Sequence, residues 1–90
     1  MKLYGYKYTC WDDIQSNYTS HDLWKTKKSA LAVIDKVVHE IITDYNKNRA
    51  GRHAAHREPV SVQKLNITVY GHVTDTVELE VYEVEDDPGE

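Results

Sequence analysis

Three neighbouring residues, Ser20, His21 and Asp22, are of the types that form a hydrolase triad, in which an imidazole takes the proton of an attacking hydroxyl. Adjacent side chains point in different directions, so these three are not expected to converge on one reacting atom. Asp12 and Asp13 diverge for the same reason, which argues against a paired general acid and base. The chain also lacks a nucleophile elbow, a phosphate-binding glycine loop and a dinucleotide fingerprint. We therefore expect a protein that is not an enzyme, with a site formed only between subunits as the open alternative.

Cysteine and histidine are too dispersed to predict a metal centre. Cys10 is the only cysteine, so an intramolecular disulfide is impossible and the residue is expected to act as a small buried hydrophobe. His53 and His56 are three residues apart and would share one side of a helix, but two ligands make a weak site. We expect neither a metal nor another cofactor.

Charge is divided unevenly along the chain. The first 74 residues hold all eleven Lys and Arg and seven of the acids, whereas residues 75–90 hold eight acids and no Lys or Arg. Such a two-faced electrostatic surface selects partners and accelerates their encounter.

The basic part predicts one candidate site. Its members are Lys47, Arg49, Arg52, His53, His56 and Arg57, in a basic loop spanning residues 47–57 that could instead be a frayed extension of the helix. Lys and Arg side chains in such a loop would contact phosphates, with Tyr45 or Tyr70 nearby to stack on bases. Nucleic-acid or nucleotide binding is therefore the alternative function, although a sequence pI of 5.7 is low for such domains.

The acidic part predicts the preferred site. Its members are Glu78, Glu80, Tyr82, Glu83, Glu85, Asp86 and Asp87. On a strand, Glu78, Glu80 and Tyr82 would share one face, with the carboxylates steering a partner and the tyrosine anchoring it. A solvated strand face with a solubilising tail is the competing interpretation.

One amphipathic helix is predicted from Thr26 to Tyr45. Thr26 offers a hydroxyl N-cap, and the apolar residues behind it repeat at spacings of three and four. The stripe consists of Leu31, Ile34, Val38, Ile41 and Tyr45, and it is widened by Ala30, Val33, Val37 and Ile42. A stripe of this width indicates a helix that lies against a sheet or in a wide interface.

Alternating apolar and polar residues predict three strands. One runs from Lys2 to Thr9, and residues 65–73 and 77–81 form an antiparallel hairpin with a turn near Thr74 and Asp75. Residues 10–21 are expected to form a connection after the first strand. A short strand around residues 22–25 is a further option. The expected fold is α+β, a three-stranded mainly antiparallel sheet in the order strand, helix, strand, strand, with the helix packed on one face. Residues 1–85 form a single domain and residues 86–90 an acidic tail.

Tyrosines are expected on the sheet face away from the helix. The set is Tyr4, Tyr6, Tyr8, Tyr70 and Tyr82, each of which alternates with residues assigned to the helix side. Exposed tyrosines are typical of surfaces that bind partners, but they also pack across strands. A homodimer that used this face or a sheet edge would bury them as well.

The order of these elements, a strand over residues 2–9, a helix over 26–45 and an acidic hairpin over 65–85, resembles the small single-domain proteins of bacteriophage accessory regions. Many of those proteins, anti-CRISPR proteins among them, inhibit host enzymes or bacterial defence systems. The resemblance is one of architecture, and it assigns no residue a role. Together with the missing catalytic motifs, the divided charge and the surface tyrosines, the resemblance leads us to expect a phage-encoded inhibitor without enzymatic activity. It would cover a functional surface of a larger bacterial protein or protein–nucleic-acid complex. Residues 1–7 also lack the apolar stretch of a signal peptide, so the expected location is the bacterial cytoplasm rather than a membrane.

Overall fold

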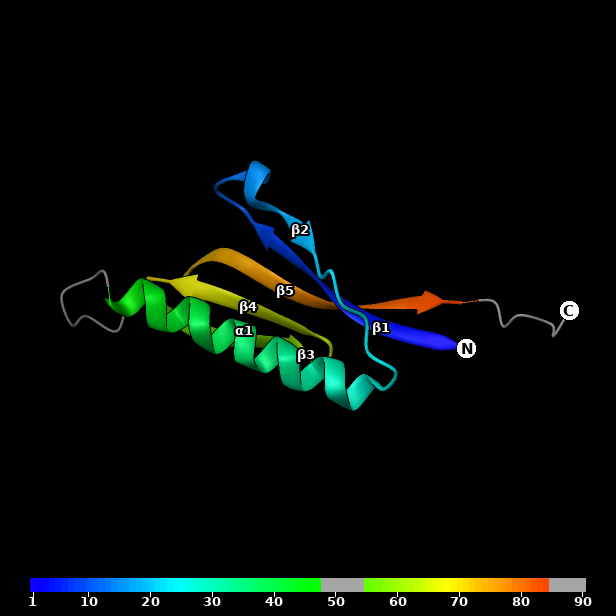
Figure 1. The fold of residues 1–90 in the computed structure, drawn as a ribbon. Coiled ribbons are helices and arrows are strands. Elements are labelled where there is room, and N and C mark those ends of the chain that lie inside the picture. Colours follow the sequence, from blue (N-terminus) through cyan, green and yellow to red (C-terminus); the bar gives the residue numbers. More distant parts are fainter. Residues whose placement is uncertain (48–54, 85–90) are drawn as a thin grey trace, which may run out of the picture.

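The computed structural model describes residues 1–47 and 55–84, and it contains one long helix on one antiparallel sheet (Figure 1). In chain order the elements are β1 (Lys2–Cys10), the 3₁₀ turn η1 (Ile14–Ser16), β2 (Tyr18–Thr19), α1 (Lys27–Lys47), β3 (Ala55–Ser61), β4 (Lys64–Val69) and β5 (His72–Glu83). The strands lie in the order β2-β1-β5-β4-β3, and every neighbouring pair is antiparallel. The predicted α+β class is confirmed.

The sheet has five strands, so the predicted number of three is wrong. The additional strands, β2 and β3, are the two outer ones, and neither shows an alternating apolar pattern. Six of the seven residues of β3 are exposed, because among the described residues this strand pairs only with β4 and lies at the border of the core. The strand expected around residues 22–25 is reduced to one bridge between Tyr4 and Trp24.

The helix follows its sequence signals closely. Thr26 caps it, because its hydroxyl oxygen accepts a hydrogen bond of 3.1 Å from the backbone N–H of Ser29. The buried positions Ala30, Ile34 and Val38 are the centre of the predicted stripe. The helix runs two residues beyond Tyr45, to Lys47.

The turn between β4 and β5 falls at Tyr70 and Gly71, four residues before its predicted place. Both residues have positive φ, 51° and 82°, as a two-residue turn of type I′ requires. The register then shifts between Ile67 and Thr68, which leaves Thr74 as an extra residue in β5. This bulge turns Asp75 to the buried side of the sheet instead of leaving it in a polar turn.

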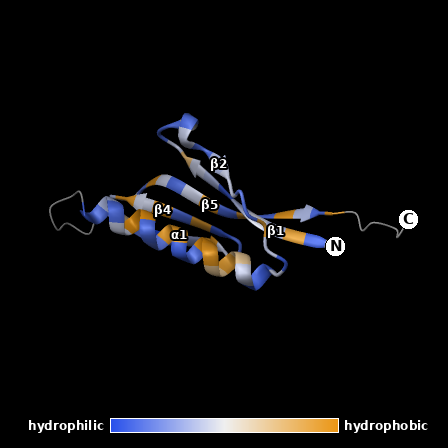
Figure 2. Ribbon diagram, viewed as in Figure 1, coloured by the Kyte–Doolittle hydropathy of each residue, from blue (hydrophilic) through white to orange (hydrophobic). Residues whose placement is uncertain are grey.

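The core lies between α1 and the centre of the sheet. Its fully buried side chains are Ile34 and Val38 from α1 and Ile67 and Val77 from β4 and β5. Hydrophobic and hydrophilic residues alternate around α1 as expected for a helix with one buried side (Figure 2).

The helix crosses the sheet at an angle, which leaves part of the sheet uncovered. Its start is close to β1, because Trp24 exchanges backbone hydrogen bonds of 2.7 and 2.8 Å with Tyr4. Its end is held at β3, where the side chain of Asn46 bonds both the N–H and the carbonyl of Ala55. The C-terminal half of α1 therefore diverges from β1 and β2 (Figure 1).

Candidate functional site

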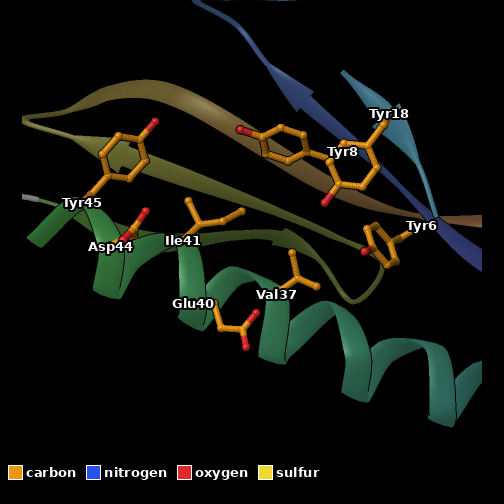
Figure 3. Close-up of a pocket in the computed structure, with 8 residues that line it drawn as sticks. All are labelled: Tyr6, Tyr8, Tyr18, Val37, Glu40, Ile41, Asp44 and Tyr45. Carbon is orange, nitrogen blue, oxygen red and sulfur yellow. The ribbon is translucent and has the colours of Figure 1, made fainter. Parts of the chain in front are cut away.

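A groove opens where α1 diverges from β1 and β2. Its volume is about 730 Å³, within the range of sites that hold a small ligand or a partner's side chains. Eight residues line it: Tyr6, Tyr8 and Tyr18 from the strands, and Val37, Glu40, Ile41, Asp44 and Tyr45 from the helix (Figure 3). In the figure, the strand tyrosines and the helix residues lie on opposite sides of the opening.

Sheet register explains why tyrosines form one wall. Tyr6 pairs with Leu79 and Tyr8 pairs with Val77, and directly opposed residues of an antiparallel pair lie on the same face. Both partners belong to the buried core, so the two tyrosines lie on the helix side. The expectation that they occupy the opposite face is wrong, because the tyrosines, and not Leu3, Gly5 and Thr9, are the β1 residues that pair with core residues of β5.

The strand tyrosines form one aromatic cluster. Tyr18 lies opposite Tyr8 across the β1–β2 pair, with ring centroids 5.2 Å apart, and its ring meets that of Tyr6 edge-on at 6.2 Å. Trp24 stacks on Tyr6 at 6.3 Å. Tyr18 stays 45% exposed, so the cluster is packed by cross-strand contacts and still reaches solvent.

The other tyrosines do not join the groove. Tyr4 packs against the core, whereas Tyr70 lies in the β4–β5 turn and is exposed. Tyr82 pairs with Leu3 and lies on the face opposite the helix. Of the five tyrosines predicted to share that face, Tyr82 alone is a strand residue found there.

A buried carboxylate holds two of the lining tyrosines in place. Asp75 has no exposed surface, and its two oxygens accept hydrogen bonds from the hydroxyls of Tyr8 at 2.5 Å and Tyr45 at 2.9 Å. The hydroxyl of Thr74 donates a third bond, of 2.7 Å. Burial and the bond to Asp75 raise the pKa of Tyr45 to about 12, and the same two causes raise the pKa of Tyr8 further. These phenols therefore remain protonated and fixed in position at neutral pH.

The helix side of the groove is acidic. Glu40 and Asp44 are four residues apart, so both carboxylates lie on the side of α1 that borders the groove, and both are exposed. None of the lining residues in the described part of the chain is Lys, Arg or His. Burial, and then the neighbouring Tyr18 hydroxyl, raise the pKa of Tyr6 to about 12, so Glu40 and Asp44 carry the charge of the opening.

The predicted acidic site is spread along the opposite face of β5. Glu78, Glu80 and Tyr82 alternate with Val77 and Leu79, which belong to the core, so they share the outer face as expected. Glu78 lies between Lys7 of β1 and Lys64 of β4 in the strand register, which offsets its charge. Glu83 ends β5, while Glu85, Asp86 and Asp87 lie outside the described residues, as does the tail of residues 86–90.

The predicted basic site is only partly described. Lys47 ends α1, whereas His56 and Arg57 belong to β3 rather than to a loop. The guanidinium of Arg57 binds the carboxylate and the backbone carbonyl of Asp35, and this pairing lowers the pKa of Asp35. Arg49, Arg52 and His53 lie outside the described residues.

The remaining candidates for chemistry have structural roles. The Ser20 hydroxyl accepts a bond from the N–H of Tyr6 and donates one to the carbonyl of Asp22, which fixes the segment after β2. Cys10 is a free, half-buried thiol opposite Asp75. Within residues 1–47 and 55–84, no group of three metal-ligating side chains comes together. Over the same residues, no helix has the length and hydrophobicity needed to span a membrane.

Sequence reasoning missed Asp75 and the groove that it supports. The one signal for them was the pair Tyr70-Gly71, since a glycine in second position is typical of a type I′ turn. Placing the turn there would have put Asp75 within β5. Comparison with protein-family models, with curated proteins and with solved structures found no match.

Proposed function

We propose that this protein is a binding module that receives a positively charged side chain, Lys or Arg, of a partner protein in the groove between α1 and β1–β2. One observation carries the proposal: tyrosine rings form one wall, two carboxylates border the other, and none of the eight described lining residues is cationic. This combination is complementary to a cation and unfavourable for an anion.

The tyrosine wall supplies contact area and an attractive ring face. A cation over a tyrosine ring contributes about 0.5–2 kcal/mol, the larger value applying when the cation is removed from water. Bonds from Tyr8 and Tyr45 to Asp75 fix those rings before a ligand arrives, so little side-chain entropy remains to be lost on binding.

The carboxylates supply orientation and a favourable encounter. Glu40 and Asp44 are exposed and lie one helical turn apart. The two carboxylates can therefore accept hydrogen bonds from different N–H groups of one guanidinium, or from an ammonium and a nearby backbone amide of the partner. Arg is favoured over Lys, because its flat guanidinium stacks on a ring while it binds a carboxylate.

This proposal keeps the predicted class of function, protein binding without catalysis, but moves the main contact from the outer face of β5 to the groove. Asp75 is completely buried and accepts three hydroxyl bonds, which supports a role in positioning tyrosines. If the bound Arg or Lys belongs to the functional surface of a larger bacterial protein, binding would inhibit that protein. This inhibition stays a prediction, as does nucleic-acid binding through residues 47–57.

The test is selection from a random-peptide library followed by calorimetry on the selected peptides. We expect enrichment of Arg- and Lys-containing peptides. The double variant Glu40→Lys/Asp44→Lys should then lower affinity about tenfold or more, equivalent to ~1.4 kcal/mol.

The matched control is Asp12→Lys/Glu58→Lys, which changes the net charge equally at exposed positions away from the groove. This control should bind the selected peptides like the parent protein, apart from a small loss in association rate. Equal losses in the two double variants, or enrichment of peptides without a cation, would contradict the proposal.

A further inference from the structure

The end of β5 has an edge that no other strand covers. β1 pairs with β5 as far as Glu83, but β4 pairs with it only as far as Glu78. The two strands β1 and β5 therefore continue together past the end of β4 (Figure 1). Over this stretch, β5 has a neighbour on one side only among the described residues.

Backbone hydrogen bonds show which groups face the uncovered side. Val84 exchanges hydrogen bonds with Met1, so Val84, and by alternation Tyr82 and Glu80, direct their backbone groups toward β1. Leu79 points the other way, since its N–H donates to the carbonyl of Gln63 at 2.8 Å. By the same alternation, the N–H and carbonyl groups of Val81 and Glu83 face away from β1, where no described strand receives them.

The edge of the sheet formed by β3 is less suited to accept an added strand, because it contains a proline. In β3, the N–H of Ala55 bonds to the side chain of Asn46 and not to β4, so Pro59, four residues later, also faces outward. Proline has no N–H to offer an added strand, and it is a common protection of edge strands. The β5 edge has no proline between His72 and Glu83.

Apolar side chains border the open stretch. Val81 is 51% exposed on its helix-side face, and Val62, next to Gln63 in the β3–β4 turn, is 78% exposed. The Leu79–Gln63 bond places that turn at the start of the uncovered edge. A strand added beside Val81 would cover it and come within reach of Val62.

Charge defines the chemistry of the occupant. Glu80 lies on the outer face opposite Gly5, so no side chain of β1 stands across from it to offset its carboxylate. A second copy of this chain is unfavourable, because two such edges paired together would bring the Glu80 and Glu83 carboxylates of both copies close to each other. A cationic residue opposite Glu80 and an apolar one opposite Val81 complement the edge.

We propose that the edge of β5 from Leu79 to Glu83 accepts an extended segment of another protein, with alternating basic and apolar residues, as an additional strand. Backbone hydrogen bonds to Val81 and Glu83 would hold it, and Glu80 would select its charge. This surface shares no residue with the groove. Hydrogen exchange at Val81 and Glu83 therefore reports on the edge independently of any binding in the groove.

The first experiment uses the unmodified protein and a capped peptide of alternating lysine and valine, followed by amide hydrogen exchange. We expect the peptide to slow exchange at Val81 and Glu83 by about tenfold or more, with no comparable change at Glu80 and Tyr82, which already bond to β1. Unchanged exchange at Val81 and Glu83 would overturn the proposal.

The second experiment compares Val81→Pro with Val81→Thr. Proline removes an N–H that points away from β1 and so spares the β1–β5 ladder, while threonine keeps the N–H. We expect Val81→Pro to weaken peptide affinity about tenfold and Val81→Thr to weaken it by about twofold or less; equal affinities would overturn the proposal.

Two controls define the occupant. In the groove variant Glu40→Lys/Asp44→Lys, the lysine–valine peptide should still slow exchange at Val81 and Glu83, whatever the groove contributes to total affinity. A peptide of alternating glutamate and valine should leave exchange at both residues unchanged in the parent protein. A concentration-dependent dimer that Val81→Pro abolishes would show that a second copy occupies the edge, and it would overturn the assignment to a basic segment.

Discussion

The helix side of the sheet contains two regions that differ in how completely α1 covers them. Over β4 and β5 the contact is closed, and Ile34, Val38, Ile67 and Val77 are at most 1% exposed. Beside β1 and β2 the contact is open, and Tyr18 is 45% exposed at the border of a groove of about 730 Å³.

Residue type accounts for the difference. Branched aliphatic side chains have no polar group, so they contribute to stability by being buried and closely packed, as they are beneath α1. Tyrosines bury a ring and keep a hydroxyl in contact with water or with a partner such as Asp75, so the open region tolerates partial exposure. The closed region is therefore expected to determine stability and the open region to determine binding.

The largest expected effect is in the closed region. Ile67→Ala removes a fully buried side chain and should lower the free energy of unfolding by about 2–5 kcal/mol. Tyr18→Ala removes ring contacts in the open region and should cost about 1 kcal/mol. Urea denaturation measures both, and similar losses in the two variants would contradict the division between the regions.

Asp75 links the two regions, so its replacement should affect both. Asp75→Ala leaves the Tyr8 and Tyr45 hydroxyls without their acceptor, which should cost about 1–3 kcal/mol. Asp75→Asn keeps one acceptor oxygen and should cost less. Chemical denaturation gives the stability, and the mobility of the tyrosine rings in NMR spectra gives the effect on the groove. If the rings of the alanine variant stay as ordered as before, Asp75 does not organise the groove.

A glycine in β1 allows the segment that follows β2 to pack closely against that strand. A methyl group on Gly5 would come within 2.6 Å of the Ser20 hydroxyl and 2.9 Å of Leu23, so Gly5→Ala should displace the segment that follows β2. The expected loss is about 1–3 kcal/mol, as for other overpacked sites. Hydrogen exchange should become faster at Ser20 and Trp24, which bond to β1, and stay unchanged in β4. Uniform acceleration over the whole sheet would show that the two regions are not separable.

The last prediction concerns the pH dependence of stability that the tyrosine hydroxyls cause, which is absent at neutral pH and appears only at high pH. Tyr6 and Tyr45 have pKa values raised to about 12, compared with about 10 in the unfolded chain. The folded state therefore binds their protons more tightly, and this contribution to stability is complete below pH ~10 and is lost as the pH rises through ~12. Tyrosinate absorbance should show a late-titrating group that Tyr45→Phe reduces. Titration of all seven tyrosines together near pH ~10 would contradict the structure.

The parts of the fold that were predictable carry their own local signals. The threonine cap and the repeat from Leu31 to Tyr45 indicate a helix without reference to the rest of the chain, and the alternation of β4 is clear because one face of it is buried. Strands β2 and β3 were not predictable in this way, because they pair on one side only and expose most of their side chains.

The phase of β1 illustrates a second limit. Tyrosines alternate there with Leu3, Gly5, Lys7 and Thr9. Composition alone does not decide which of the two sets faces the helix, since tyrosine occurs in buried and in exposed positions. The register with Val77 and Leu79 decides it. The shared face of Glu78, Glu80 and Tyr82 was predictable from their alternation in β5. The lysines that flank Glu78 come from β1 and β4, so their position could not be predicted without the strand order.

The central claim is that the groove beside α1 selects a cation. Its most direct test is an NMR titration of the parent protein with N-acetyl-arginine amide, and with the uncharged analogue N-acetyl-citrulline amide as the matched control. We predict saturable shifts at Tyr18, Glu40 and Asp44 with the arginine compound and little change with citrulline. Equal shifts with both compounds, or shifts confined to residues outside the groove, would contradict the account.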